Sequence, residues 1–187
     1  MNDTERITVG DTLIPLRRQL CDASGQPIDI SADTITLDMT ASIGGASVVS
    51  GGAVTKKQIG TGLASITGVT AANPPVVTVT NHGLSTGDMV IIDGSNMIGM
   101  DQIKGKQFQV TNIGTNTFSL DSVNGINYTA YVSGGSADTR GMVQYAWQNA
   151  DVDESGNFYV QFIRTNAAQT EHIPAAKELR VEVIATV

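Results

Sequence analysis

Short runs in which apolar and polar residues alternate are the feature that most constrains how this chain can fold. In three such runs the apolar members share one face, and these are Ile35, Leu37 and Met39, then Phe158, Val160 and Phe162, then Leu179, Val181 and Val183. Successive side chains of a β-strand point to opposite faces, so this period of two indicates strands with one buried face.

Further short runs rich in apolar residues look similar and are also expected to be strands: Val76–Thr80, Met89–Ile92, Phe108–Val110, Thr117–Leu120 and Val143–Trp147. Turn dipeptides such as Asn124-Gly125 separate these runs. No long window carries the i, i+3, i+4, i+7 stripe of an amphipathic helix. The sequence therefore predicts an all-β fold of the sandwich or small-barrel kind.

Charge and composition exclude several classes of partner. The 187 residues include 11 Lys plus Arg against 18 Asp plus Glu, which gives a net charge of −7, and the basic residues are scattered. Nucleic-acid binders need clustered cations, so we expect no nucleic-acid partner. No run is apolar enough for a membrane helix, and the residues from Met1 to Arg6 do not form a secretory signal.

The metal-ligating residue types are sparse. The chain has one cysteine, Cys21, and two histidines, His82 and His172. One cysteine allows neither an internal disulfide nor a zinc site of the four-cysteine type. We therefore expect no bound metal and no cofactor.

The segment Asn81–Asp88 contains a His, a Ser and an Asp close together in sequence. A catalytic triad is defined by the spatial roles of its members, and neighbours in one loop rarely adopt those roles. Two glycines between strand-like runs instead indicate a structured turn that Asp88 braces through backbone N–H groups.

The segment Asp151–Gly156 resembles the beginning of a calcium-binding loop. The calcium motif requires Asp or Asn at its fifth position and Glu at its twelfth, where this chain has Ser155 and Phe162. We interpret the segment as an acidic turn. Since no part of the sequence assembles a nucleophile, a base and an orienting group, we expect a protein that is not an enzyme.

Composition also indicates how the chain is divided. Residues 43–68 and 132–141 are rich in small and polar residues, and a compact strand-rich stretch lies between them. Linker-like flanks on both sides are typical of an inserted domain. We predict a discontinuous outer domain of residues 1–62 and 139–187 and an inserted β-module of residues 63–138.

Several outer segments resemble a known phage domain, and these are Gly10–Leu16, Leu20–Ile30, Ile35–Met39, Gly141–Trp147 and Gly156–Phe162. Together they are similar to the immunoglobulin-like N-terminal domain of phage baseplate upper proteins. The resemblance implies an immunoglobulin-like β-sandwich as the outer domain.

The middle of the chain resembles a second family, through Val79–Val90, Gly105–Val110, Asn116–Asp121 and Tyr128–Tyr131. These segments are similar to the first catalytic cysteine half-domain (FCCH) of ubiquitin-activating enzymes, which implies a small barrel-like β-module. Copies of this module are common in phage tail proteins. The segment contains no cysteine, so the resemblance does not extend to the enzymatic role.

Together the two resemblances imply a non-enzymatic structural component of a bacteriophage virion, assembled in the cytoplasm of the bacterial host. We expect a tail or baseplate adaptor, or a decoration subunit, because no fibre-holding segment follows the end of the first domain at about Val187. The expected partners are other virion proteins of the tail, baseplate or capsid and further copies of the chain in a symmetric ring. Two alternatives stay open, a capsid decoration or head-fibre protein and a module that binds host glycans.

Two sets of residues are candidates for these contacts. We interpret the N-terminal segment from Ile7 to Leu16 as one extended edge strand that pairs with a neighbouring subunit. Its candidate interface residues are Ile7, Val9, Leu13, Ile14 and Leu16. The candidate glycan-stacking residues are Tyr128, Tyr131 and Tyr159.

Overall fold

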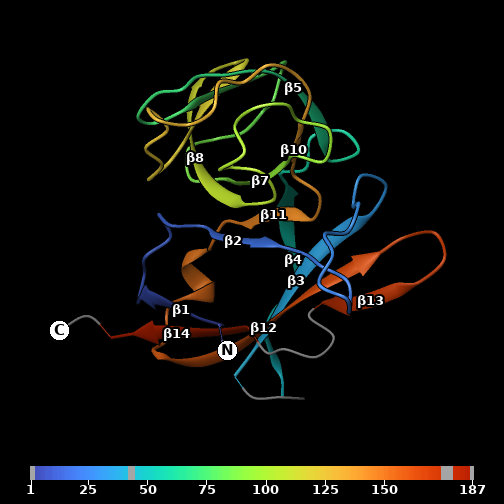
Figure 1. The fold of residues 1–187 in the computed structure, drawn as a ribbon. Coiled ribbons are helices and arrows are strands. Elements are labelled where there is room, and N and C mark those ends of the chain that lie inside the picture. The colour runs from blue at the N-terminus through green and yellow to red at the C-terminus, as the bar shows by residue number, and fades with distance from the viewer. Residues whose placement is uncertain (1–2, 42–44, 174–178, 186–187) are drawn as a thin grey trace. The chain divides into compact units, whose positions relative to one another are not determined.

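The computed structural model describes residues 3–41, 45–173 and 179–185. The chain forms two compact units, an outer unit of Met1–Lys56 with Val143–Val187 and an inserted unit of Lys57–Met142. Both consist of β-strands (Figure 1), and the one helical element among the described residues is the short 3-10 helix η1 (Asn149–Asp151). The predicted all-β fold class is confirmed.

The outer unit is an eight-stranded sheet that curls on itself. Its strands are β1 (Asp3–Thr8), β2 (Leu16–Gln19), β3 (Thr34–Thr40), β4 (Ser47–Lys56), β11 (Met142–Tyr145), β12 (Gly156–Thr165), β13 (Thr170–Ile173) and β14 (Leu179–Ile184). Their order is β1-β14-β12-β3-β4-β11-β2, with β13 paired to β12. The strands β1 and β14 run parallel, while β12 is antiparallel to its neighbours β3, β13 and β14.

The period-two pattern fills the core of this sheet, as the sequence predicts. All nine apolar members of the three alternating runs in β3, β12 and β14 are buried. The intervening residues of β3, such as Asp38, are half-buried or exposed. Shifting a strand by one residue would exchange these two faces, so burial of one face fixes the register of the sheet.

The curl of the sheet depends on β4. This strand pairs with β3 as far as Ala53 and then with β11 from Val54 to Lys56, and its pairing with β3 contains register shifts. A Cβ atom on Gly52 would lie 2.7 Å from Cε2 of Tyr145, so only glycine lets this ring approach the strand so closely. A strand with such irregularities can belong to both halves of a folded-over sheet.

The inserted unit is a closed six-stranded barrel, as expected for the middle module. Its strands are β5 (Leu63–Val69), β6 (Val76–Val79), β7 (Met89–Asp93), β8 (Gln107–Gly114), β9 (Thr117–Leu120) and β10 (Ser136–Asp138). Around the barrel their order is β10-β5-β6-β9-β8-β7, and β10 pairs with both β5 and β7. The barrel has its own core, around fully buried residues such as Phe118, Ile92 and Leu120.

The two units divide between Lys56 and Lys57 and between Met142 and Val143, a few residues outside the predicted boundaries at 62/63 and 138/139. The residues between the predicted and observed boundaries belong to the barrel unit because they bond to one another. The Lys57 N–H donates to the Met142 carbonyl over 2.8 Å, and the Ile59 N–H donates to the Thr139 hydroxyl over 2.9 Å. Within the small and polar stretch, residues 47–56 form β4 and residues 63–68 form most of β5, so these residues are not a linker.

Candidate protein interaction site

The N-terminal segment does not form one strand from Ile7 to Leu16, so that prediction is wrong. Strand β1 ends at Thr8 and β2 begins at Leu16, with a loop between them. The turn has a local cause, because Gly10 adopts a φ of +76° and the Asp11 N–H donates to the Thr8 carbonyl over 2.9 Å.

Three of the five candidate interface residues belong to the core of the outer unit. Ile7 and Leu16 are buried, with 7% and 1% of their surface exposed. Val9 is partly buried and packs against the same cluster. Because they contribute to folding, these three side chains are not available to a partner.

The other two candidates, Leu13 and Ile14, are presented to solvent. Their exposed fractions are 89% and 64%, the two largest for a large hydrophobic side chain in the described part of the outer unit. The Asp11 carboxylate accepts the Leu13 N–H over 3.0 Å, and the Gly10 N–H donates to the Val152 carbonyl over 2.9 Å. The loop of residues 9–15, called here the Leu13–Ile14 loop, therefore has a braced backbone under two exposed aliphatic side chains.

The two ends of the curled sheet, β1 and β2, are guarded against strand pairing. Glu5 lies on the same face of β1 as the buried Ile7, and Arg18 lies on the same face of β2 as the buried Leu16 and Leu20. The Arg18 guanidinium donates to the Glu5 carboxylate over 3.0 Å. Inward-pointing charges are a known device that blunts the edge of a sheet. The Leu13–Ile14 loop is therefore a better docking candidate than the strand edges.

The three candidate glycan-stacking tyrosines are half-buried rather than exposed. Tyr128 and Tyr131 pack against the barrel core. The Tyr131 hydroxyl lies 2.9 Å from the Ile66 carbonyl oxygen and 3.1 Å from that of Gly134. Tyr159, in the outer unit, is covered by the Arg180 guanidinium, 5.3 Å from its ring centroid. Each of these rings therefore has an intramolecular partner.

The Asn81–Asp88 segment is a structured turn, and the predicted role of Asp88 is confirmed. Its carboxylate accepts the Ser85 N–H over 2.8 Å and lies 3.4 Å from the Lys57 ammonium. His82 is buried, with its Nδ1 accepting the Leu84 N–H over 3.0 Å and its Nε2 lying 2.8 Å from the Gly114 carbonyl oxygen. These contacts hold the turn on the barrel.

The acidic segment after β11 is a turn in which Asp151 braces the backbone. The buried carboxylate of Asp151 accepts the Tyr145 hydroxyl and the Gln148 N–H, each over 2.8 Å. Burial, followed by the hydrogen bond and the negative charge of Asp151, raises the pKa of Tyr145 far above its ordinary value. Across residues 3–41, 45–173 and 179–185, no group of three His, Cys, Asp or Glu side chains is placed to hold a metal ion.

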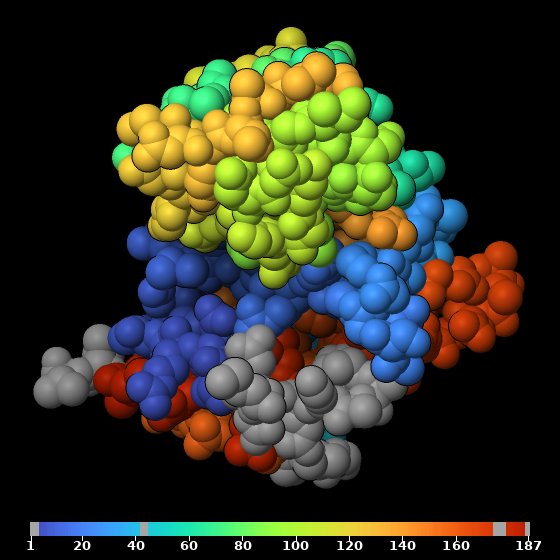
Figure 2. Space-filling model, viewed as in Figure 1, coloured from blue at the N-terminus to red at the C-terminus, as the bar shows by residue number. Residues whose placement is uncertain are grey.

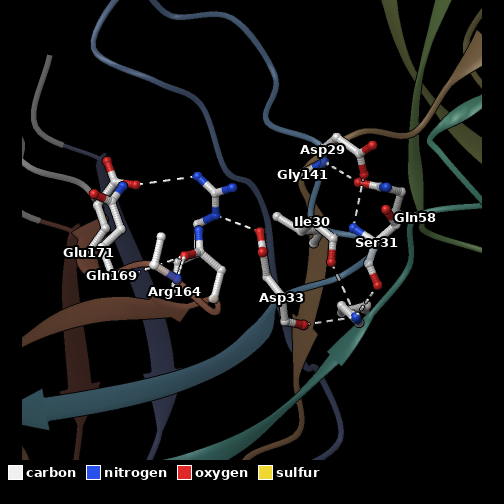
Figure 3. A network of polar contacts seen from close by, with 12 residues as sticks. Asp29, Ile30, Ser31, Asp33, Gln58, Gly141, Arg164, Gln169 and Glu171 are labelled. Atoms are coloured by element: carbon white, nitrogen blue, oxygen red, sulfur yellow. Dashed lines mark hydrogen bonds and ion pairs between the residues drawn. The ribbon is translucent and has the colours of Figure 1, made fainter.

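A polar network that the sequence did not reveal holds the loop before β3 (Figure 3). The Arg164 guanidinium on β12 donates to the buried Asp33 carboxylate and lies 3.4 Å from Glu171. The Lys56 ammonium donates to the carbonyls of Ile30, Ser31 and Asp33 over 2.9 to 3.2 Å. Arg164 and Asp33 are 131 positions apart in sequence, so no local pattern could have paired them. The network stabilises the fold.

Comparison with known proteins supports the resemblance of the middle module. Residues 72–140, just over a third of the chain, match the family described as the ubiquitin-activating enzyme E1 FCCH domain. No curated protein matches the chain. In the part of the chain that the structure describes, no helix is both long and apolar enough to span a membrane. The inserted barrel is thus similar to the FCCH domain, and this match lies within the inserted unit.

Proposed function

We propose that this chain is a non-enzymatic structural component of a bacteriophage virion, placed at the tail or baseplate as an adaptor or decoration subunit. The FCCH match of residues 72–140 supports the inserted-module half of this proposal. The resemblance of the outer segments to the N-terminal domain of phage baseplate upper proteins supports the virion half. The function is docking to other particle proteins.

The observation that carries the proposal is the Leu13–Ile14 loop. Two adjacent aliphatic side chains are exposed by 89% and 64% on a backbone that Asp11 and Gly10 hold in place. Burying one such side chain is worth about 1.5–3 kcal/mol. A loop that is already ordered loses little conformational entropy on binding, so most of this free energy is available for affinity.

Immunogold labelling of intact virions with an antibody against this chain tests the placement. We expect gold at the tail tip or along the tail. Gold spread over the head would instead favour the capsid decoration or head-fibre alternative. Absence of gold from intact and disrupted particles would contradict the virion proposal altogether.

Substitution of the exposed pair tests the docking surface. The double variant Leu13→Asp/Ile14→Asp should lower incorporation into particles by about tenfold or more, because charged side chains cannot enter an apolar pocket. The matched control is Val48→Asp on β4, an apolar side chain of the same unit that is 44% exposed. Incorporation is measured by quantitative mass spectrometry of purified virions. Equal incorporation of both variants would show that the loop is not the docking surface.

A further inference from the structure

The pair Asn124-Gly125 is a turn signal in the sequence, and it is also a chemically reactive dipeptide. It is the only Asn-Gly pair in the chain. It belongs to the loop of residues 121–128, at the surface of the barrel, where Figure 2 shows the yellow part of the chain. Glycine has no side chain to obstruct its backbone nitrogen, so this nitrogen can reach the side-chain carbonyl of a preceding asparagine in a chain that is free to move.

The reaction open to such a pair is deamidation. A bond forms between the Gly125 nitrogen and Cγ of Asn124, and the bond from Cγ to Nδ2 breaks. The amide proton of Gly125 passes through the solvent to the departing nitrogen, which leaves as ammonia. Water then opens the resulting five-membered imide on either side, to give aspartate or isoaspartate at position 124. Water is the only co-reactant.

The hydrogen bonds of the folded barrel occupy both reacting groups. Asn124 is exposed, but Gly125 is buried. The Gly125 N–H donates to the Ala72 carbonyl over 2.9 Å, so its proton is not presented to a base in the solvent. The Ile126 N–H donates to Oδ1 of Asn124 over 3.3 Å, which holds the carboxamide in place.

Packing around Gly125 opposes the rotation that the reaction requires. A Cβ atom on Gly125 would lie 2.6 Å from Cγ of the buried Pro75 and 3.0 Å from the Ala72 carbonyl oxygen. The Tyr128 N–H donates to the Gly125 carbonyl over 3.0 Å. The peptide group before Gly125 therefore cannot turn toward the Asn124 side chain while the loop stays against residues 72–75.

We propose that Asn124 is a deamidation site that the closed barrel holds inactive, and that it reacts only in molecules whose 121–128 loop has left residues 72–75. Isoaspartate lengthens the backbone by one carbon atom. Since Gly125 is packed where not even a Cβ atom fits, a chain with isoaspartate at position 124 does not close again as before. The site thus records openings of the barrel irreversibly. This inference does not depend on the proposed function.

Deamidation of the full chain in mildly alkaline buffer, folded and in unfolding urea, tests the proposal. Mass spectrometry of the peptide that contains Asn124 measures the fraction converted. We expect conversion to be about tenfold slower or more in the folded chain, because only open molecules react. Pro75→Ala removes ring atoms that cover Gly125 and should raise the folded-state rate several-fold. The control Ile113→Ala, at a residue of β8 that is 57% exposed, should leave this rate unchanged. Equal rates in the folded and unfolded wild type would overturn the proposal.

Hydrogen exchange of the Gly125 amide in the wild type covers the case in which Pro75→Ala unfolds the barrel. We expect this amide to be protected, because it donates to Ala72. Urea below the unfolding midpoint should speed exchange and deamidation in parallel, since both need the same opening. A Gly125 amide that exchanges as fast as in the unfolded chain would contradict the proposal, as would deamidation that does not follow exchange.

Discussion

Several buried polar side chains in this protein bond to backbone groups, and Asp151 is the clearest case. Its carboxylate lies at the end of β11, where it accepts the Tyr145 hydroxyl and the N–H of Gln148. The same contact raises the pKa of Tyr145, because the phenolate would be buried beside a carboxylate. The pair thus links the stability of the outer unit to alkaline pH.

The variant Tyr145→Phe should lower the free energy of unfolding at pH 7 by about 1–3 kcal/mol, since Asp151 loses a partner. The neutral phenol is favoured in the folded state, so this stabilisation is complete below the pKa of an unfolded tyrosine, about 10, and is lost as pH rises above it. The difference between wild type and variant should therefore shrink from pH 10 upward.

Urea titrations followed by tryptophan fluorescence measure this difference. Trp147 is the only tryptophan of the chain and lies in the core of the outer unit, with its ring 5.3 Å from that of Tyr145. The control is Tyr159→Phe, in the same unit. A difference between wild type and Tyr145→Phe that stays constant between pH 7 and 11 would contradict the assigned cause.

At the scale of elements, the sequence predicted the strands that contain a clear apolar run and missed strands such as β4 that do not. The three alternating runs in β3, β12 and β14 are buried as expected, because one apolar face is enough to specify a half-buried strand. Strand β4 contains Gly51, Gly52 and several small polar residues, so its sequence has the composition of a linker. Its strand conformation is determined by its neighbours β3 and β11, which lie far away in sequence.

Sequence periodicity also failed to separate the buried from the exposed residues of the candidate interface. Ile7, Leu13, Ile14 and Leu16 are equally apolar, yet two are in the core and two are in solvent. What separates them is the turn at Gly10, which no periodicity reveals. A prediction of a strand through this turn placed all four side chains on one edge.

The bend of β4 offers a test at this scale. Gly52→Ala places a Cβ atom 2.7 Å from Cε2 of Tyr145 and 2.9 Å from Cγ1 of Val49, which is closer than such atoms pack. We expect a loss of about 1–3 kcal/mol in the free energy of unfolding, measured by Trp147 fluorescence in urea. Ala53→Ser, at an exposed position of the same strand, is the control and should change stability by less than about 0.5 kcal/mol. A Gly52→Ala variant as stable as the wild type would mean that the curl does not require this close approach.

At the scale of the whole molecule, each unit has its own apolar core and its own hydrogen-bonded strands. The barrel begins and ends at one point, where the Lys57 N–H donates to the Met142 carbonyl. On the outer side of this point, Lys56 and Val143 face each other as partners on the antiparallel strands β4 and β11. In the chain, the inserted unit therefore takes the place of a hairpin turn that would join the neighbouring strands β4 and β11.

Replacing residues 57–142 with the dipeptide Asn-Gly should leave the outer unit folded, because this dipeptide forms the two-residue turn that antiparallel partners require. The isolated fragment 57–142 should also fold, since a closed barrel has no unpaired edge. Dispersed amide signals in NMR spectra of both chains, together with buried-type Trp147 fluorescence in the shortened chain, are the expected results. An unfolded fragment would show that the barrel needs the outer unit to fold.

The meeting of the barrel's two ends at one hydrogen-bonded pair also bears on how such a chain can arise and be rebuilt. A segment with adjoining ends can enter or leave a gene as one in-frame cassette, and the pairing of β4 with β11 on either side keeps its register. The site is thus a ready-made graft point. A reporter or an affinity domain whose termini lie equally close together should therefore be able to replace the barrel between β4 and β11.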